Sequence, residues 1–195
     1  MKYSVLIALI NLVFGRLTAQ PDSAFLKTLK DVIREIQPES TIYYSDLPFE
    51  DFENGFKDTK RKIYFYFDPK EHIHLSHKEK VEIISGLKAA QNSSLPDSLI
   101  INSKRIPRDS LENYTYKLNL RAAYSIATVT EAKYALYVRR FWGFSFSLPI
   151  YLRNKSLMAF YFSYYDNSGG ASWITVRKKD GEKWIRIGGL SLGAW

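Results

Sequence analysis

The chain has 195 residues, with 28 lysines and arginines against 20 acidic residues, and no cysteine. The lack of cysteine excludes disulfides, thiol catalysis and zinc–thiolate sites, so burial of apolar side chains has to stabilise the fold. The formal net charge is +8, but the basic residues are scattered along the chain. A nucleic-acid-binding protein usually concentrates its basic residues on one face, so we expect no nucleic-acid partner.

Residues 1–19, MKYSVLIALINLVFGRLTA, have the pattern of a cleavable export signal. Lys2 provides the positive start, residues 3–14 form the apolar stretch, and Ala19 is a small residue at the expected cleavage point. The apolar stretch is short for a membrane span, although a retained anchor is the alternative. We expect a periplasmic or secreted protein without membrane attachment after cleavage. Cleavage removes two of the 28 basic residues and no acidic one, which leaves a net charge of +6.

Residues 20–195 are expected to form a single domain that begins with a helix. In PDSAFLKTLKDVIREIQ, residues 21–37, apolar side chains recur at helical spacing. Asp22 or Ser23 is available as the N-cap, and Pro38 ends the helix.

The middle of the chain alternates between expected strands and helices. The predicted elements are a strand at residues 61–69, a helix at 75–92, a short strand at 98–103 and a helix at 130–143 that ends at Gly143. Residues 104–129 fit a strand or a helix, and the pattern leaves both alternatives open.

The C-terminal part of the chain has the pattern of a four-stranded meander. Its predicted strands are residues 144–152, 157–165, 171–179 and 183–190, joined by turns at 153–156, 166–170 and 180–181. Asp180-Gly181 between alternating apolar runs is a strong hairpin signal. Each of the last two strands has one apolar and one mixed face, which predicts a sheet covered on one side. Helices first and a meander last favour an α+β fold, with helices packed on a curved, mainly antiparallel sheet.

The same region resembles the C-terminal region of uncharacterised exported proteins of Bacteroidetes-type bacteria. Those proteins carry S-x-P near a strand, a Gly-rich turn, a K-x-D-G-x-W hairpin and a terminal tryptophan. The corresponding residues here are Ser147, Pro149, Ala159, Tyr161, Gly169, Gly170, Lys179, Asp180, Gly181, Trp184 and Trp195, with two residues in place of one between Gly181 and Trp184. Many of those proteins have cysteines in the Gly-rich turn, where this chain has Asn-Ser-Gly-Gly. The resemblance implies export and, because similar hairpins end NTF2-like folds, an NTF2-like or cystatin-like arrangement, but it implies no activity.

All three histidines lie in the segment EHIHLSHKEK, residues 71–80. His72 and His74 share one face of an extended segment, and His77 would follow from the first turn of the next helix. Imidazole nitrogens are preferred ligands of zinc, so the three histidines are candidate metal ligands. The alternative is a capping box, in which Ser76 caps the helix and Glu79 bonds back to it.

Aromatic side chains on the C-terminal sheet are the second candidate site. Its members are Tyr161, Tyr165, Trp173 and Trp184. A sheet face with tyrosine and tryptophan can stack on a small ligand, a glycan or a protein partner, although it can equally pack under helices.

The sequence therefore predicts an exported, non-enzymatic protein that binds a ligand or partner at a sheet face. One alternative is a metal-dependent or hydrolytic enzyme that uses the histidine segment, with zinc as the metal. Another is a structural module of a surface complex. No catalytic residue is assigned, and outside the histidine segment no cofactor is expected.

Overall fold

The fold was derived from a computed structural model, which describes residues 22–37, 41–45, 65–90, 95, 99–100, 102–124, 142–166 and 169–194. The expected export signal and most of the helix expected at residues 130–143 lie outside these described residues. Gly143, the expected end of that helix, is instead the first residue of a strand.

The described strands form one mixed sheet with the order β2-β8-β7-β6-β4-β1-β3, and β5 pairs with β6 off this path. The strands are β1 (Ile42–Ser45), β2 (Tyr66–Phe67), β3 (Ser103–Arg105), β4 (Gly143–Phe146), β5 (Ile150–Leu152), β6 (Leu157–Asp166), β7 (Gly169–Asp180) and β8 (Lys183–Ala194). Only the pairings of β1 with β3 and with β4 are parallel in the described sheet. The predicted α+β class with a mainly antiparallel sheet is confirmed.

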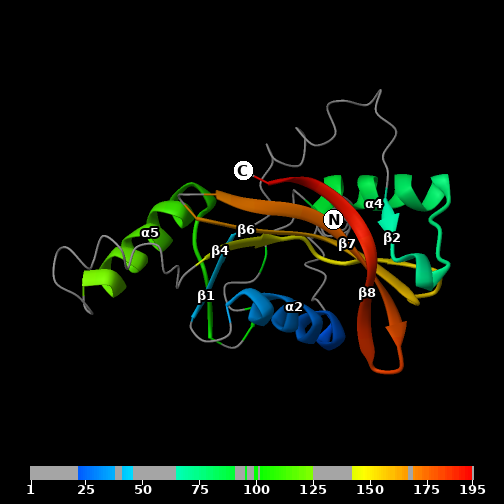
Figure 1. The fold of residues 1–195 in the computed structure, drawn as a ribbon, viewed down its shortest axis with the longest axis horizontal. Helices are drawn as coiled ribbons and strands as arrows, with labels where there is room; N and C mark the ends of the chain where they lie inside the picture. The colour runs from blue at the N-terminus through cyan, green and yellow to red at the C-terminus, as the bar shows by residue number, and fades with distance from the viewer. Residues whose placement is uncertain are drawn as a thin grey trace, which may run out of the picture.

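Three described α-helices pack against this sheet, on both of its faces (Figure 1). They are α2 (Ser23–Ile36), α4 (His77–Ala90) and α5 (Arg108–Tyr124), and the short 3₁₀ helix η1 (Pro69–Glu71) precedes α4. The prediction of a sheet covered on one side is wrong. On β6, Phe160 and Phe162 are buried in the core with α2. Ala159 and Tyr161, at alternate positions of the same strand, are buried in the core with α4.

The first helix forms as predicted. Asp22 is the N-cap, and its side chain accepts a hydrogen bond from the amide of Phe25 at 2.7 Å. Phe25 is fully buried, and its ring packs edge-on against Phe160 at 5.3 Å between centroids. The cap fixes where α2 begins, and the aromatic contact holds its first turn against the sheet.

The capping box at α4 is also present. Glu79 N–H donates to the Ser76 hydroxyl at 3.2 Å, and Ser76 N–H donates to Oε2 of Glu79 at 2.7 Å. Two otherwise unpaired amides at the start of the helix are thereby satisfied.

Other expected elements differ from the structure. The strand expected at 98–103 is wrong, because residues 99–100 form a bend and β3 begins only at Ser103. Residues 104–129, which fitted either a strand or a helix by sequence, contain the helix α5. The expected strand at 144–152 is divided into β4 and β5 by residues 147–149, where Pro149 has no amide hydrogen to donate. The strand expected at 61–69 is described only from residue 65, and within residues 65–69 only β2 is a strand.

The four-stranded pattern ends in a tight hairpin between β7 and β8. The loop residues are Gly181 and Glu182, one position later than predicted, because Asp180 pairs with Lys183. Gly181 has φ +57°, a conformation that glycine adopts without steric cost. The register of β7 and β8 shifts between Ser172 and Trp173 and between Val176 and Arg177. Such bulges bend strands, and Figure 1 shows the hairpin curving past the first turn of α2.

Candidate functional site

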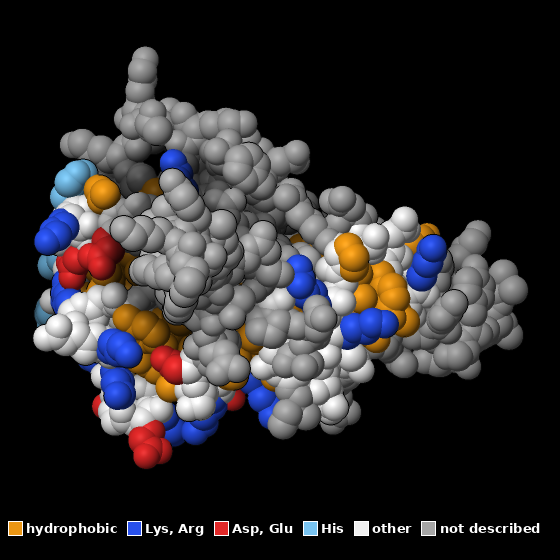
Figure 2. Space-filling model, turned by 180° about the vertical axis from the view of Figure 1, so that it is seen from behind, with side chains coloured by type: hydrophobic (Ala, Val, Ile, Leu, Met, Phe, Trp, Pro, Cys, Tyr) orange, Lys and Arg blue, Asp and Glu red, His pale blue; other side chains and the backbone are white. Residues whose placement is uncertain are grey.

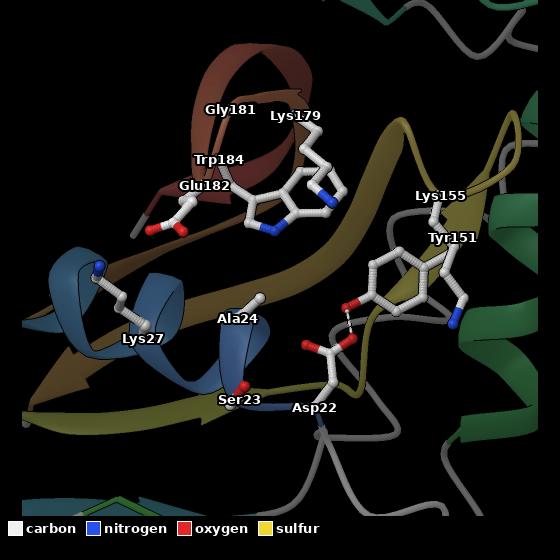
Figure 3. Close-up of a pocket in the computed structure, with 10 residues that line it drawn as sticks. All are labelled: Asp22, Ser23, Ala24, Lys27, Tyr151, Lys155, Lys179, Gly181, Glu182 and Trp184. Atoms are coloured by element: carbon white, nitrogen blue, oxygen red, sulfur yellow. Dashed lines mark hydrogen bonds between the residues drawn. The ribbon is translucent and has the colours of Figure 1, made fainter.

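A cleft of about 450 Å³ lies where the first turn of α2, the end of β5 and the β7–β8 hairpin meet (Figure 3). Its lining residues are Asp22, Ser23, Ala24, Lys27, Tyr151, Lys155, Lys179, Gly181, Glu182 and Trp184. Pockets of roughly 300–1,000 Å³ are typical of small-molecule sites. The curvature of the hairpin creates this space, because it carries Trp184 toward α2.

Trp184 forms the buried floor of the cleft. Its side chain is 8 % exposed, packs in the core cluster that contains Phe25, and lies 5.9 Å from the Tyr151 ring. The indole Nε1 is buried and has no hydrogen-bond partner among the described residues. Figure 3 shows this nitrogen on the side of the ring that faces the space between Ala24 and Tyr151. Trp184 thus has a donor that is unpaired among the described residues and covered in this conformation, and a ligand acceptor would reach it after a small movement of the ring or its neighbours.

Asp22 and Tyr151 join α2 to β5 at one side of the cleft. Oδ1 of Asp22 accepts from Phe25 N–H, and Oδ2 accepts from the Tyr151 hydroxyl at 2.5 Å. Burial, followed by the Asp22 carboxylate, raises the pKa of Tyr151 well above its usual range. The Tyr151 hydroxyl therefore stays protonated, and both carboxylate oxygens of Asp22 are engaged.

Three lysines stand at the rim. Lys27, Lys155 and Lys179 are exposed, and Nζ of Lys155 lies 5.7 Å from the centroid of the Tyr151 ring. The acidic residue Glu182 is also exposed at the hairpin. The rim therefore carries charges of both signs. Figure 2 shows the same mixture more widely, with Lys and Arg beside Asp and Glu at the α4 end of the face seen from behind.

An unusual turn between β5 and β6 positions Lys155. Arg153, Asn154 and Lys155 have φ angles of 50°, 52° and 62°. This left-handed region is unfavourable for residues with a side chain, so neighbouring contacts have to hold the turn. Ser156 N–H donates to the carbonyl of Arg153 at 3.1 Å, and Lys179 N–H donates to the carbonyl of Ser156 at 2.9 Å. The second bond brings the backbone of Lys155 close to that of Lys179.

Arg153 ties the same turn to the start of α4. Its Nε donates to Oε1 of Glu79 at 2.6 Å, and one of its terminal nitrogens donates to the His74 carbonyl at 2.7 Å. The Arg153 guanidinium, helped by the Ser76 donors, lowers the pKa of Glu79 to about 2. Glu79 is therefore occupied by the cap and this ion pair.

The structure does not assemble the histidines into a metal site. His72 ends η1 in a left-handed conformation with φ 47°, and His77 begins α4. All three histidine side chains, including that of His74, are exposed. Within the described part of the chain, no three His, Cys, Asp or Glu residues are arranged to hold a metal ion.

The four aromatic candidates do not form one surface. Trp173 and Trp184 pack on the α2 face of the sheet, and Trp173 lies between the rings of Phe162 and Tyr164. Tyr161 is fully buried under α4. Tyr165 packs in the cluster with α5. Among these four residues, only Trp184 lines the cleft.

Sequence reasoning missed the other residues of the cleft. Asp22 was identified only as a helix cap, Tyr151 only as part of a strand, and Lys155 and Lys179 only as parts of a turn and a strand. The spacing along the chain gives no signal that links them, because Asp22 and Tyr151 are 129 positions apart.

Across the described ranges, no helix combines the length and apolar character needed to cross a membrane. Comparison with protein-family models, with curated proteins and with solved structures finds no significant match for this chain.

Proposed function

We propose that this chain is an exported, non-enzymatic protein that binds a small molecule in the cleft between α2 and the β7–β8 hairpin. The observation that carries the proposal is the buried Nε1 of Trp184, which has no partner among the described residues at the floor of a cleft of about 450 Å³. An unsatisfied buried donor costs about 1–3 kcal/mol, which an acceptor atom of a ligand would recover.

Binding accounts for the lining better than catalysis does. The lining residues include no histidine, and the three histidines of the chain lie near α4 instead. Both oxygens of Asp22 are already engaged, Oδ1 by Phe25 N–H and Oδ2 by the Tyr151 hydroxyl. This leaves Trp184, the exposed lysines, Ser23 and Glu182, and among the described residues no hydrogen bond joins the Ser23 hydroxyl to a base, as a nucleophile–base pair would require.

Export stays a prediction that rests on residues 1–19. Expression of the full chain in a Gram-negative host, followed by mass spectrometry of the periplasmic protein, tests it. The expected N-terminus is Gln20, and a full-length membrane-bound product would contradict it. The NTF2-like or cystatin-like arrangement and the likeness to exported proteins of Bacteroidetes-type bacteria are predictions of the same kind.

The binding proposal is tested with a fragment library and the indole N–H resonances of the purified, isotope-labelled protein. The Trp184 resonance, assigned by its loss in Trp184→Phe, is expected to shift with the fragments that bind. Trp173→Phe is the matched control, because Trp173 lies on the same sheet face outside the cleft. Fragments that bind equally well to the protein with Trp184→Phe and leave the Trp184 resonance unmoved would contradict the proposal.

A further inference from the structure

We infer that the ligand of this cleft carries an anionic group, a carboxylate in the simplest case, that accepts from Trp184 Nε1 and pairs with Lys179. The inference rests on the proposed binding function and narrows its ligand class. It is carried by three features of the cleft: its excess of hydrogen-bond donors, the cation bonded to the backbone of Trp184, and the arrangement of its lysines.

The donor excess follows from what each lining group can do. The Trp184 indole and the lysine ammoniums are donors only. Each carboxylate oxygen of Asp22 already accepts one hydrogen bond, Oδ1 from Phe25 N–H and Oδ2 from the Tyr151 hydroxyl. Glu182 keeps acceptor capacity, but it lies exposed at the loop of the hairpin. The donors Trp184, Lys27, Lys155 and Lys179 outnumber the carboxylates Asp22 and Glu182, so a ligand group that only accepts, such as a carboxylate, complements these donors.

Arg177 is a cation bonded to the backbone of Trp184. One of its terminal nitrogens donates to the Trp184 carbonyl at 2.9 Å, and its Nε is buried with no partner among the described residues. Burial lowers the pKa of Arg177, while the carboxylates of Glu35 and Asp31 on α2 act in the opposite direction. The residue that holds Trp184 in position is thus a cation that solvent screens poorly.

The lysines are not equivalent around the cleft. Lys179 is the cross-strand partner of Trp184, and Lys155 lies beside Tyr151, with its Nζ 5.7 Å from the ring centroid (Figure 3). The bond from Lys179 N–H to the Ser156 carbonyl joins β7, which carries Lys179, to the turn that carries Lys155. Lys27 lies on α2, at the other side of the cleft from Tyr151 and Lys155 (Figure 3). Because Lys179 is the cross-strand partner of Trp184, the favourable position for an anion lies between Trp184 and Lys179.

The first turn of α2 contributes in the same direction. Ser23 and Ala24 line the cleft, and the N-terminal end of a helix carries a partial positive charge. Asp22 already uses one amide of this turn, so the helix end supplements the lysines rather than forming the site.

Matched pairs of acidic and neutral probes test the inference. The pairs are glucuronate with glucose, benzoate with benzamide, and succinate with succinamide, each at constant ionic strength. At least one acid is expected to raise the melting temperature and shift the Trp184 indole resonance, while its neutral partner does neither. Lys179→Met should weaken binding of that acid about tenfold, as expected for loss of one charged hydrogen bond. Lys183→Met, on the same hairpin but outside the cleft lining, should change it less than about twofold.

Each other outcome counts against a different claim. Equal binding of the acids and neutral probes, lost in Trp184→Phe, overturns the anion preference and leaves the binding function standing. If Lys179→Met and Lys183→Met weaken binding of the acid equally, the proposed position beside Lys179 is wrong, and the net positive charge of the hairpin attracts the acid instead. If no acid binds, the anion inference is wrong, whereas fragments that shift the Trp184 resonance would still support binding.

Discussion

The Tyr151 hydroxyl donates to the carboxylate of Asp22 across 129 positions of sequence, and the same carboxylate caps α2. One side chain therefore begins the first helix, joins it to β5 and closes one side of the cleft. Loss of Asp22 removes two interactions, whereas loss of the tyrosine hydroxyl removes one.

We expect Asp22→Ala to lower the free energy of unfolding by about 2 kcal/mol, because it removes both the cap and the acceptor of the Tyr151 hydroxyl. Tyr151→Phe should lower it by about 1 kcal/mol. In a double-mutant cycle measured by urea denaturation, the two changes should be less than additive. Strictly additive effects would show that the hydrogen bond contributes nothing.

The ion pair between Glu79 and Arg153 predicts a stability change at acid pH. The pKa of Glu79 is about 2 in the folded protein against an ordinary value of 4.5. A lowered carboxyl pKa stabilises the fold above the unfolded value, and the contribution is lost as pH falls through the window from 4.5 to about 2. Because Arg153 leaves 40 % of its side chain exposed, solvent screening reduces the contribution. We expect it to be about 1 kcal/mol.

Glu79→Gln measures this contribution. Its difference in unfolding free energy from the native protein should be largest at neutral pH and should vanish below the window. Glu82→Gln, at an exposed position of the same helix, is the control and should show no such dependence. A difference between the native protein and Glu79→Gln that stays constant with pH would refute the assignment.

The left-handed turn predicts opposite effects on stability and binding. Lys155→Gly relieves a φ of 62° but removes a cation from the cleft. It should therefore be more stable than Lys155→Ala, which keeps the unfavourable conformation, by about 1 kcal/mol. Both variants should bind the acidic probes more weakly than the native protein. Equal stability of the two variants in urea denaturation would show that the turn is not held in this conformation.

Two glycines of β8 provide a test and a control for the packing of the edge strand β2 against β8. A Cβ on Gly188 would lie 2.3 Å from the Tyr66 carbonyl and 2.7 Å from the Phe67 ring, whereas at Gly193 it would meet nothing within 4 Å. Gly188→Ala should displace β2 and destabilise the protein by about 1–3 kcal/mol. Gly193→Ala should change stability by less than about 0.5 kcal/mol. Faster hydrogen exchange at residues 66–68 in Gly188→Ala alone would support this, and equal effects would contradict it.

Local patterns in the sequence predicted the local structure. The cap at Asp22, the box at Ser76 and Glu79, and the terminal meander depend on neighbouring residues, and all three are present. The burial of both sheet faces was missed, although the uninterrupted apolar run of residues 157–162 is typical of a strand buried on both sides.

The cleft was less accessible to sequence reasoning. Trp184 was a candidate because of its residue type, but its partners come from α2, β5 and the turn after it. Their meeting depends on the curvature of the hairpin and on Arg153, whose contact with Glu79 spans 74 positions. No periodicity or motif encodes such distant contacts. The shared sheet face expected for Tyr161 and Trp184 failed because these residues lie on opposite faces.

The most direct test of the account is the Trp184 indole N–H resonance during titration with the acidic and neutral probes. We predict a saturable downfield shift with an acidic probe, because the indole donor gains an acceptor, while the Trp173 resonance stays in place. A Trp184 resonance that does not move with any acidic probe or fragment, while the protein remains folded, would contradict the claim that this cleft is a binding site.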